Sequence, residues 1–389
     1  MQNTQMLLRA TRRQASPYFP ALTGEQARLA RAFHSSFPQY APTPLAELSA
    51  LAAQMGLKSL LVKDESQRFG LNAFKVLGGS YAIARHIAAR LGLRPEEMTF
   101  AALKGEAARA ALGNAVFFTA TDGNHGRGVA WTARELGCRA MVRMPKGTAK
   151  SRVENIRALG AEVTVEDCNY DGCVRLAARQ AKETPGGVLV QDTAWPGYTQ
   201  TPLWIMQGYL TMALEADEQM VAPPTHIFLQ AGVGSMAAAV AAYFRQAHPQ
   251  NPPKIILVEP TAADCFFRSA ANGEITAVTG EMRTMMAGLA CGEPSPIAWD
   301  ILKRLTAAYL SCEDAAAARG MRALARPLAG DKAIVSGESG ASTLGALLDA
   351  AVDEKAREAL GLDGNARVLL FSTEGDTDPV NYRRVMEEN

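Results

Sequence analysis

From about residue 60 onward, short apolar runs alternate with longer segments of helical periodicity. Short apolar runs bounded by turn residues are typical of buried parallel strands, and parallel strands need a crossover, usually a helix, between them. The sequence predicts strands at 61–65, 115–120, 139–145, 162–167, 187–192, 225–230, 254–260 and 367–373, and helices at 79–91, 125–136, 149–158 and 171–183. This alternation predicts an α/β protein with open, largely parallel three-layer α/β/α sheets and right-handed crossovers.

The strand–helix units fall into two groups along the 389 residues. Residues 76–190 suffice for a small α/β domain, inserted into a large domain built from residues 1–75, including an N-terminal arm, and 191–389. Ligands in open α/β sheets bind outside the carboxyl ends of strands and often between lobes. We therefore expect the functional residues at strand ends.

Charge and cysteine usage restrict the possible partners. Lysine and arginine total 40 against 39 acidic residues, which gives no reason to expect nucleic acid or an anionic membrane as partner. No apolar run approaches the roughly 18–20 residues of a membrane span. The six cysteines lack CxxC pairs, and free thiols in a reducing cytoplasm are expected, although a pair such as Cys265 and Cys291 stays open. The five histidines are scattered and suggest no metal site. The pattern favours a cytoplasmic protein that binds a small molecule.

The first polar cluster, LNAFKVLGGS, ends at Ser80 and has Lys75 at its centre. A lysine between Phe74 and Val76, just ahead of a helix, is expected to be buried. Burial lowers a lysine pKa from about 10.4 and makes a nucleophilic amine available for imine formation. The two glycines that follow let a flat ligand approach the backbone. Lys75 alone is equally compatible with a surface lysine whose aliphatic stem is packed at the start of a helix.

The second cluster, TDGNHGRG at 121–128, directly follows an expected strand. Backbone N–H groups at the start of the next helix can hold a carboxylate. Asn124 offers a neutral amide to a phenolic oxygen, and Asp122 supplies an ionisable base. A simple helix cap remains the alternative for the turn, and His125 is expected to be packed.

The third cluster, QAGVGSMA at 230–237, can form a nest of N–H donors for a phosphate at a helix N-terminus. It also satisfies G-x-G-x-x-A, with Glu259 ending the next strand, as in dinucleotide-binding folds. An NAD-dependent oxidoreductase is therefore an alternative. It predicts no special lysine elsewhere in the chain, whereas an imine-forming cofactor requires one.

In order and spacing these clusters resemble the fold type II pyridoxal phosphate (PLP) enzymes related to the tryptophan synthase β subunit and threonine dehydratase. Within that group the chain is similar to the diaminopropionate ammonia-lyase family from roughly residue 30 to the C-terminus. The segments that carry the similarity are FGLNAFKVLGGSYA, TDGNHGRGVAW, EDCNYDG, QDTAWPGYT, LQAGVGSMA, MAGLACGEP, GESGA and STEGDTDP. The resemblance implies α,β-elimination of D- and L-2,3-diaminopropionate to pyruvate and ammonia, in a homodimer that carries PLP as a Schiff base on Lys75.

The resemblance also implies roles for single residues. Lys75 is expected to be a general base as well as the anchor. Asp122 replaces a serine usual in related dehydratases and is expected to be a second base on the opposite side of Cα. The expected cofactor contacts besides Lys75 are Asn124, Gly232, Val233, Gly234, Ser235, Met236 and, for the pyridine nitrogen, Ser372, with Thr373 as the alternative because a one-residue strand shift exchanges them.

The expected substrate contacts are Ser80, Thr121, Asp122 and Asp192. Asp192 either pairs with the distal ammonium of the substrate or caps a turn. A serine or threonine dehydratase and a PLP- or amino-acid-binding module without turnover are further alternatives.

Overall fold

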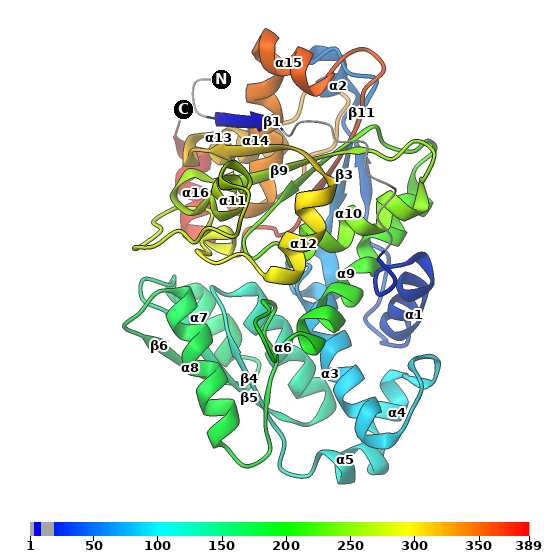
Figure 1. The fold of residues 1–389 in the computed structure, drawn as a ribbon, viewed down its shortest axis with the longest axis vertical. Coiled ribbons are helices and arrows are strands. Elements are labelled where there is room, and N and C mark those ends of the chain that lie inside the picture. Colours follow the sequence, from blue (N-terminus) through cyan, green and yellow to red (C-terminus); the bar gives the residue numbers. More distant parts are fainter. Residues whose placement is uncertain (1–3, 9–18, 389) are drawn as a thin grey trace.

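The computed structural model describes residues 4–8 and 19–388 and consists of two α/β lobes, one above the other in Figure 1. The remaining residues of the expected N-terminal arm, 1–3 and 9–18, lie outside the described residues. Each lobe contains one sheet, and the prediction of open, largely parallel α/β sheets is confirmed.

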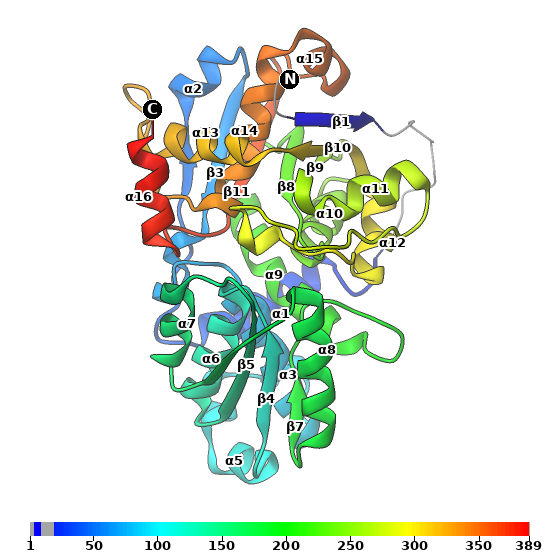
Figure 2. The ribbon, with the colours of Figure 1, turned by 90° about the vertical axis from the view of Figure 1, so that its left-hand side faces the viewer.

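The small lobe holds a four-stranded parallel sheet in the order β6 (Glu162–Glu166), β5 (Arg139–Pro145), β4 (Val116–Ala120) and β7 (Gly187–Leu189). Its crossover helices are α6 (Asn124–Leu136), α7 (Lys150–Arg157) and α8 (Tyr170–Glu183). In Figure 2, α8 lies on one side of this sheet, with α6 and α7 on the other. Phe117 packs with the α6 side and Phe118 packs with α8, as the alternation of side chains along a strand requires. All four strands lie within residues 76–190.

The large lobe holds a seven-stranded sheet in the order β1 (Thr4–Leu8), β10 (Thr306–Cys312), β9 (Lys254–Pro260), β8 (His226–Gln230), β11 (Arg367–Ser372), β3 (Ser59–Asp64) and β2 (Leu45–Glu47). The five central strands are parallel, and the two edge strands β1 and β2 are antiparallel to their neighbours. We did not expect β1, β2 or β10 from the sequence. The edge strands are short, and the alanine-rich sequence of β10 has little of the apolar signal of a central strand.

The helices of the large lobe cover both faces of this sheet. Ile227 and Leu229 of β8 pack on the side of α9 and α10, whereas Phe228 packs on the side of α13 and α14. None of the described helices is both long and apolar enough to cross a membrane. The helices outside the small sheet are α1 (Gly24–Ser35), α2 (Ser49–Gln54), α3 (Val76–Leu91), α4 (Phe100–Lys104), α5 (Glu106–Leu112), α9 (Gln200–Gln219), α10 (Ser235–Ala247), α11 (Cys265–Asn272), α12 (Pro296–Leu305), α13 (Asp314–Ala325), α14 (Glu338–Val352), α15 (Glu354–Leu360) and α16 (Pro379–Glu387).

The close packing of α3 on α9 fixes where Lys75 lies, because Lys75 immediately precedes α3. Two glycines make this approach possible. A Cβ on Gly208 of α9 would collide with the carbonyl oxygen of Leu77, and one on Gly78 of α3 would collide with the ring of Tyr209. The start of α3 is therefore held against α9 at backbone distance.

We expect Gly208→Ala to reduce the free energy of unfolding by about 1–3 kcal/mol, because the overlap with the backbone of α3 outweighs the better helix propensity of alanine. Chemical denaturation measures the change. Gly364→Ala is the matched control, since a Cβ on Gly364 would meet no atom within 4 Å. Equal stability of the two variants would contradict the tight α3–α9 contact.

Candidate active site

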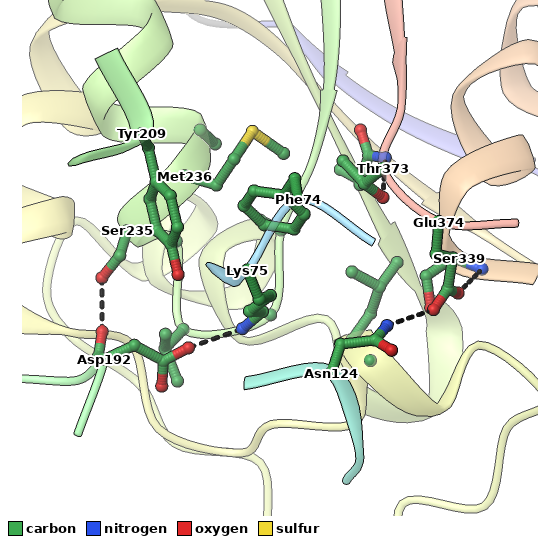
Figure 3. A pocket seen from close by; sticks show the side chains of 18 residues that line it. Phe74, Lys75, Asn124, Asp192, Tyr209, Ser235, Met236, Ser339, Thr373 and Glu374 are labelled. Carbon is green, nitrogen blue, oxygen red and sulfur yellow. Dashed lines mark hydrogen bonds and ion pairs between the residues drawn. The ribbon is translucent and has the colours of Figure 1, made fainter. Parts of the chain in front are cut away.

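A cavity lies between the carboxyl ends of the strands of the two lobes, with about 500 Å³ of empty space including its mouth. Figure 3 shows how residues of both lobes face into it. Its lining comprises Phe74, Lys75, Asn124, Asp192, Tyr209, residues 230–237, Gly288, Leu289, Ser339, Thr373 and Glu374. The first, second and third sequence clusters and the end of β11 thus meet at one place.

Lys75 and Asp192 form an ion pair in this cavity, with Lys75 Nζ 2.5 Å from Oδ2 of Asp192; the carboxylate is buried, and the lysine side chain is 18% exposed. Burial disfavours the ammonium, but the charge of Asp192 outweighs it, and the pKa of Lys75 is raised above its ordinary value. Our expectation of a lowered lysine pKa is therefore wrong, because burial was considered without a partner. Burial similarly opposes the charge of Asp192, yet Lys75 lowers the pKa of this carboxyl below its usual range.

Other contacts hold Asp192 in place. Its Oδ1 accepts a hydrogen bond from the hydroxyl of Tyr170 at 3.0 Å and one from Gln191 Nε2 at 3.2 Å. Its backbone carbonyl accepts a bond from Ser235 Oγ at 2.5 Å. Asp192 is thus fixed by residues of both lobes, and in this structure its cationic partner is Lys75.

The turn after β4 is organised by Thr121, whose Oγ1 accepts hydrogen bonds from the backbone N–H groups of Gly123 and Gly126. Thr121 does not line the cavity, so its expected contact with substrate is not supported, and the hydroxyl is used to close the turn. Asn124 does line it, and one N–H of its amide donates to Glu374 while the other stays available. His125 is packed as expected: its Nε2 lies 2.8 Å from the carbonyl oxygen of Val190, and burial lowers its pKa.

Asp122 lies at the border of the cavity. Its Oδ2 is 3.5 Å from the position of a Cβ on Gly288, a lining residue, and 3.1 Å from Arg152 Nη1. The carboxylate is close enough to Lys75 for its charge to contribute to the raised lysine pKa.

The glycine-rich segment at 232–236 leads from β8 into α10. Gly234 has a φ of +87°, and a Cβ there would collide with the ring of Phe266, so only glycine fits. No side chain caps the start of α10. Its first backbone N–H groups therefore suit an anion such as a phosphate, at the positive end of the helix dipole.

At the end of β11 the structure reverses our choice between two hydroxyls. Ser372 is fully buried, does not line the cavity and donates to Ser336 Oγ at 2.7 Å. Our assignment of Ser372 to the pyridine nitrogen is therefore wrong by one residue. Thr373, the alternative, lines the cavity and accepts a hydrogen bond from Gln230 Nε2 at 2.9 Å.

Ser80 is a second correction. The expected substrate contact is not supported, because Ser80 lies inside α3 and does not line the cavity. Its Oγ lies 3.2 Å from His34 Nε2 and donates to the carbonyl oxygen of Leu77, with no exposed surface.

Among the lining residues that the sequence did not identify, two bring unpaired hydroxyls to the cavity. The hydroxyls of Tyr209 and Ser339 are buried without a hydrogen-bond partner among the described residues, and both residues line the cavity. Unpaired buried hydroxyls at a cavity are suited to a polar ligand. Ser339 lies in the GESGA segment, which contributed to the family resemblance but suggested no role for this serine. Tyr209 lies inside an apolar helix that carries no motif.

The residues present fit PLP, which requires an amine, a phosphate-binding backbone and a partner for the pyridine nitrogen. Lys75, the start of α10 and Thr373 supply these groups around one cavity. The dinucleotide alternative fits less well: both carboxylate oxygens of Glu259 accept backbone N–H groups of α11, at 2.8 and 2.7 Å, and are not offered to a ribose. Within residues 4–8 and 19–388, no group of His, Cys, Asp and Glu is arranged to hold a metal ion.

Comparison with known proteins agrees with this fit. Residues 37–374 match the family model described as pyridoxal-phosphate dependent enzyme. The chain belongs to this family. PLP is therefore the cofactor that Lys75 and the glycine-rich loop would hold.

Comparison with individual proteins is more specific than the match to the family model. The chain is 51% identical over 379 residues to diaminopropionate ammonia-lyase of Escherichia coli K12, which covers 95% of this chain and 93% of that protein. Crystal structures of the E. coli enzyme with an aminoacrylate–PLP azomethine reaction intermediate and with D-serine superpose with TM-scores of 0.90 and 0.91, at 47% and 46% identity, over 99% of this chain and 97% of those chains. A biosynthetic L-threonine dehydratase of Haemophilus influenzae is 30% identical over only 61% of this chain and 39% of its own length.

We expect Asp192→Asn to let Lys75 form an imine with added PLP at lower pH than the wild-type protein does. In the wild type the ion pair keeps the amine protonated up to and beyond its ordinary pKa, whereas in the variant only burial remains, and burial favours the neutral amine. The measurement is the visible absorbance that PLP develops with the cofactor-free protein, followed against pH. Asp217→Asn, which removes a carboxylate paired with His248, is the control and should leave the midpoint unchanged. An unshifted midpoint for Asp192→Asn would rule out control of the amine by Asp192.

Proposed function

We propose that this chain catalyses the PLP-dependent α,β-elimination of 2,3-diaminopropionate, in both its D and L forms, to pyruvate and ammonia. The observation that carries the proposal is the cavity itself, where the amine of Lys75 and the carboxylates of Asp192 and Asp122 converge from different elements. The E. coli relative, which carries this activity in its name, supports the same reaction for this chain.

PLP, when bound, supplies an electron-accepting ring that acidifies the Cα–H bond of an attached amino acid. Thr373 is suited to meet the pyridine nitrogen of that ring. Because Gln230 already donates to Thr373 Oγ1, the hydroxyl proton of Thr373 is left to be donated onward. A hydroxyl donor favours an unprotonated ring nitrogen, and a neutral amide at Asn124 suits the phenolic oxygen.

Two groups are suited to carry the Cα proton. Lys75 accepts it on one side once its amine is released, with Asp192 beside it to stabilise the resulting ammonium. Asp122, on the turn after β4, accepts it on the other side. Because the Cα–H bonds of the two enantiomers point in opposite directions, one base for each accounts for use of both. The E. coli relative, which was crystallised with D-serine, is consistent with this arrangement.

Asp192 also favours a diamino acid as the substrate. It already holds one alkylammonium group, that of Lys75, in a buried site. The β-ammonium of diaminopropionate is a cation of the same kind, and it is the group that leaves. Serine has no such charge, and its neutral hydroxyl gains less from a carboxylate than an ammonium does.

We further propose a cytoplasmic homodimer. The thiols of all six cysteines, Cys265 and Cys291 included, are free in the structure, as is usual for proteins of a reducing compartment. The dimer rests on the resemblance of the motifs alone, and sedimentation of the purified protein tests it.

We expect kcat/KM for diaminopropionate to exceed that for serine or threonine by at least about 100-fold, because only diaminopropionate carries the β-ammonium that the Asp192 carboxylate would bind. The comparison is made on the holoenzyme by measuring pyruvate or 2-oxobutyrate formation. A preference for serine or threonine would support the dehydratase alternative. Bound PLP without turnover of any of them would support the binding-module alternative.

We expect Asp122→Asn to lower kcat for the D isomer by about 10²–10³-fold, the usual contribution of a general base, and to change kcat for the L isomer by no more than a few-fold. The L isomer serves as the internal control, because it reports the folding and PLP content of the same protein sample. Equal losses on both isomers would mean that Asp122 has a structural role.

A further inference from the structure

Asp122 is paired with a buried arginine that the proposed function does not yet use. Arg152, in the first turn of α7, places Nη1 3.1 Å from Asp122 Oδ2, and its side chain is only 4% exposed. Its aliphatic stem lies directly on Gly123, where a Cβ would approach Arg152 Cδ to 3.1 Å. The glycine next to Asp122 therefore makes room for the arginine.

Two further buried carboxylates surround this pair. Arg152 Nη2 lies 3.8 Å from Oε2 of Glu338, at the start of α14. The second carboxylate is that of Glu374, directly after β11, whose charge also acts on Arg152. In the described part of the chain, Arg152 is the ion-pair partner of both Asp122 and Glu338. Glu374 has no ion pair there and accepts hydrogen bonds from Asn124, Thr377 and the N–H of Ser339.

One guanidinium thus lies among three carboxylates, and this excess of negative charge contributes to raised pKa values for both Arg152 and Glu338. Burial opposes the charge of Arg152, but Glu374, Asp122 and Glu338 together raise the pKa of the guanidinium. Burial and the charge of Glu374 raise the pKa of Glu338 to about 7. Without the charge of Arg152, repulsion from the two glutamates would favour an Asp122 side chain that turns away from them.

We propose that Arg152 is the positioning residue that holds Asp122, ionised, at the border of the cavity, and so determines whether the enzyme can use the D isomer. This role rests on the proposed function, in which Asp122 is the base for that isomer. Arg152 touches neither the cavity nor the reacting atoms, and it acts only through Asp122.

A merely structural role makes a different prediction. Arg152 also joins the lobes, because Asp122 belongs to the small lobe and Glu338 to the large one. If that bridge were its whole contribution, its loss would affect both isomers equally. The kinetics of the two isomers in one protein sample therefore separate the two roles.

The test compares the holoenzymes of the wild type, Arg152→Gln and Arg152→Lys on both isomers. For Arg152→Gln we expect kcat on the D isomer to fall about 10–100-fold, with KM for D and both constants for L within about threefold of wild type. With D substrate deuterated at Cα, the isotope effect on kcat should rise, while that for the L isomer stays unchanged. Arg152→Lys keeps the charge and should recover most of the D activity. The visible absorbance of bound PLP should be the same in all three proteins.

Arg143→Gln is the matched control, since Arg143 is also a buried arginine of the small lobe but bonds Gln180 and Thr164 away from the cavity. It should leave the ratio of D to L activity unchanged. Equal losses on both isomers in Arg152→Gln, or an Arg152→Lys variant no better than Arg152→Gln, would overturn the proposal. A wild type active on the L isomer alone would overturn it too. A wild type inactive on both isomers would instead overturn the proposed function, and this role with it.

Discussion

The site depends on the ion pair between Lys75 and the buried carboxylate of Asp192. These two residues lie where the chain passes from the large lobe to the small one and back, next to α3 and after β7. Removing one member of such a pair leaves an uncompensated charge in a buried site, at a cost of about 3–5 kcal/mol. The contact between Lys75 and Asp192 therefore both holds the amine in the cavity and links the two passages of the chain between the lobes. Ser235, on the glycine-rich segment at the start of α10, donates to the backbone carbonyl of Asp192 and so links this segment to the pair.

A second ion pair of similar construction lies at the border of the cavity. Asp122 and Arg152 form it on the small lobe, and Glu338 and Glu374 extend it into the large lobe. Each proposed proton acceptor, Lys75 and Asp122, thus has a buried partner of opposite charge. Such partners restrict both the orientation and the protonation state of a side chain. An enzyme that acts on both enantiomers needs two such positions, and the two lobes provide them from different elements.

Much of this arrangement could be predicted from the sequence, because it depends on local patterns. The alternation of apolar runs and helical segments predicts the parallel sheets, and the expected helices at 149–158 and 171–183 match α7 and α8 within a residue or two. The clusters around Lys75 and Asn124 were recognisable because glycine, amide and ionisable residues follow strand ends. Lys75 comes after β3 of the large sheet and Asn124 after β4 of the small sheet, and the two clusters meet because both face the cavity between the lobes.

What the sequence could not predict depends on packing between distant segments. The rise in the pKa of Lys75 requires Asp192, more than a hundred residues away. Ser372 is the last residue of β11 and Thr373 follows it, and only the register of the strand decides which of the two faces the cavity. Ser80 follows Lys75 closely in sequence but faces the core because a helix begins between them. Tyr209 had no local signal at all.

Mass spectrometry of the reduced holoenzyme shows which lysine carries the cofactor. The holoenzyme is reduced with borohydride, digested and analysed for the phosphopyridoxyl group. We expect this group on the peptide that contains Lys75 and on no other lysine. A phosphopyridoxyl group on a different lysine, such as the buried Lys63, or none in a protein that has bound PLP, would contradict this expectation.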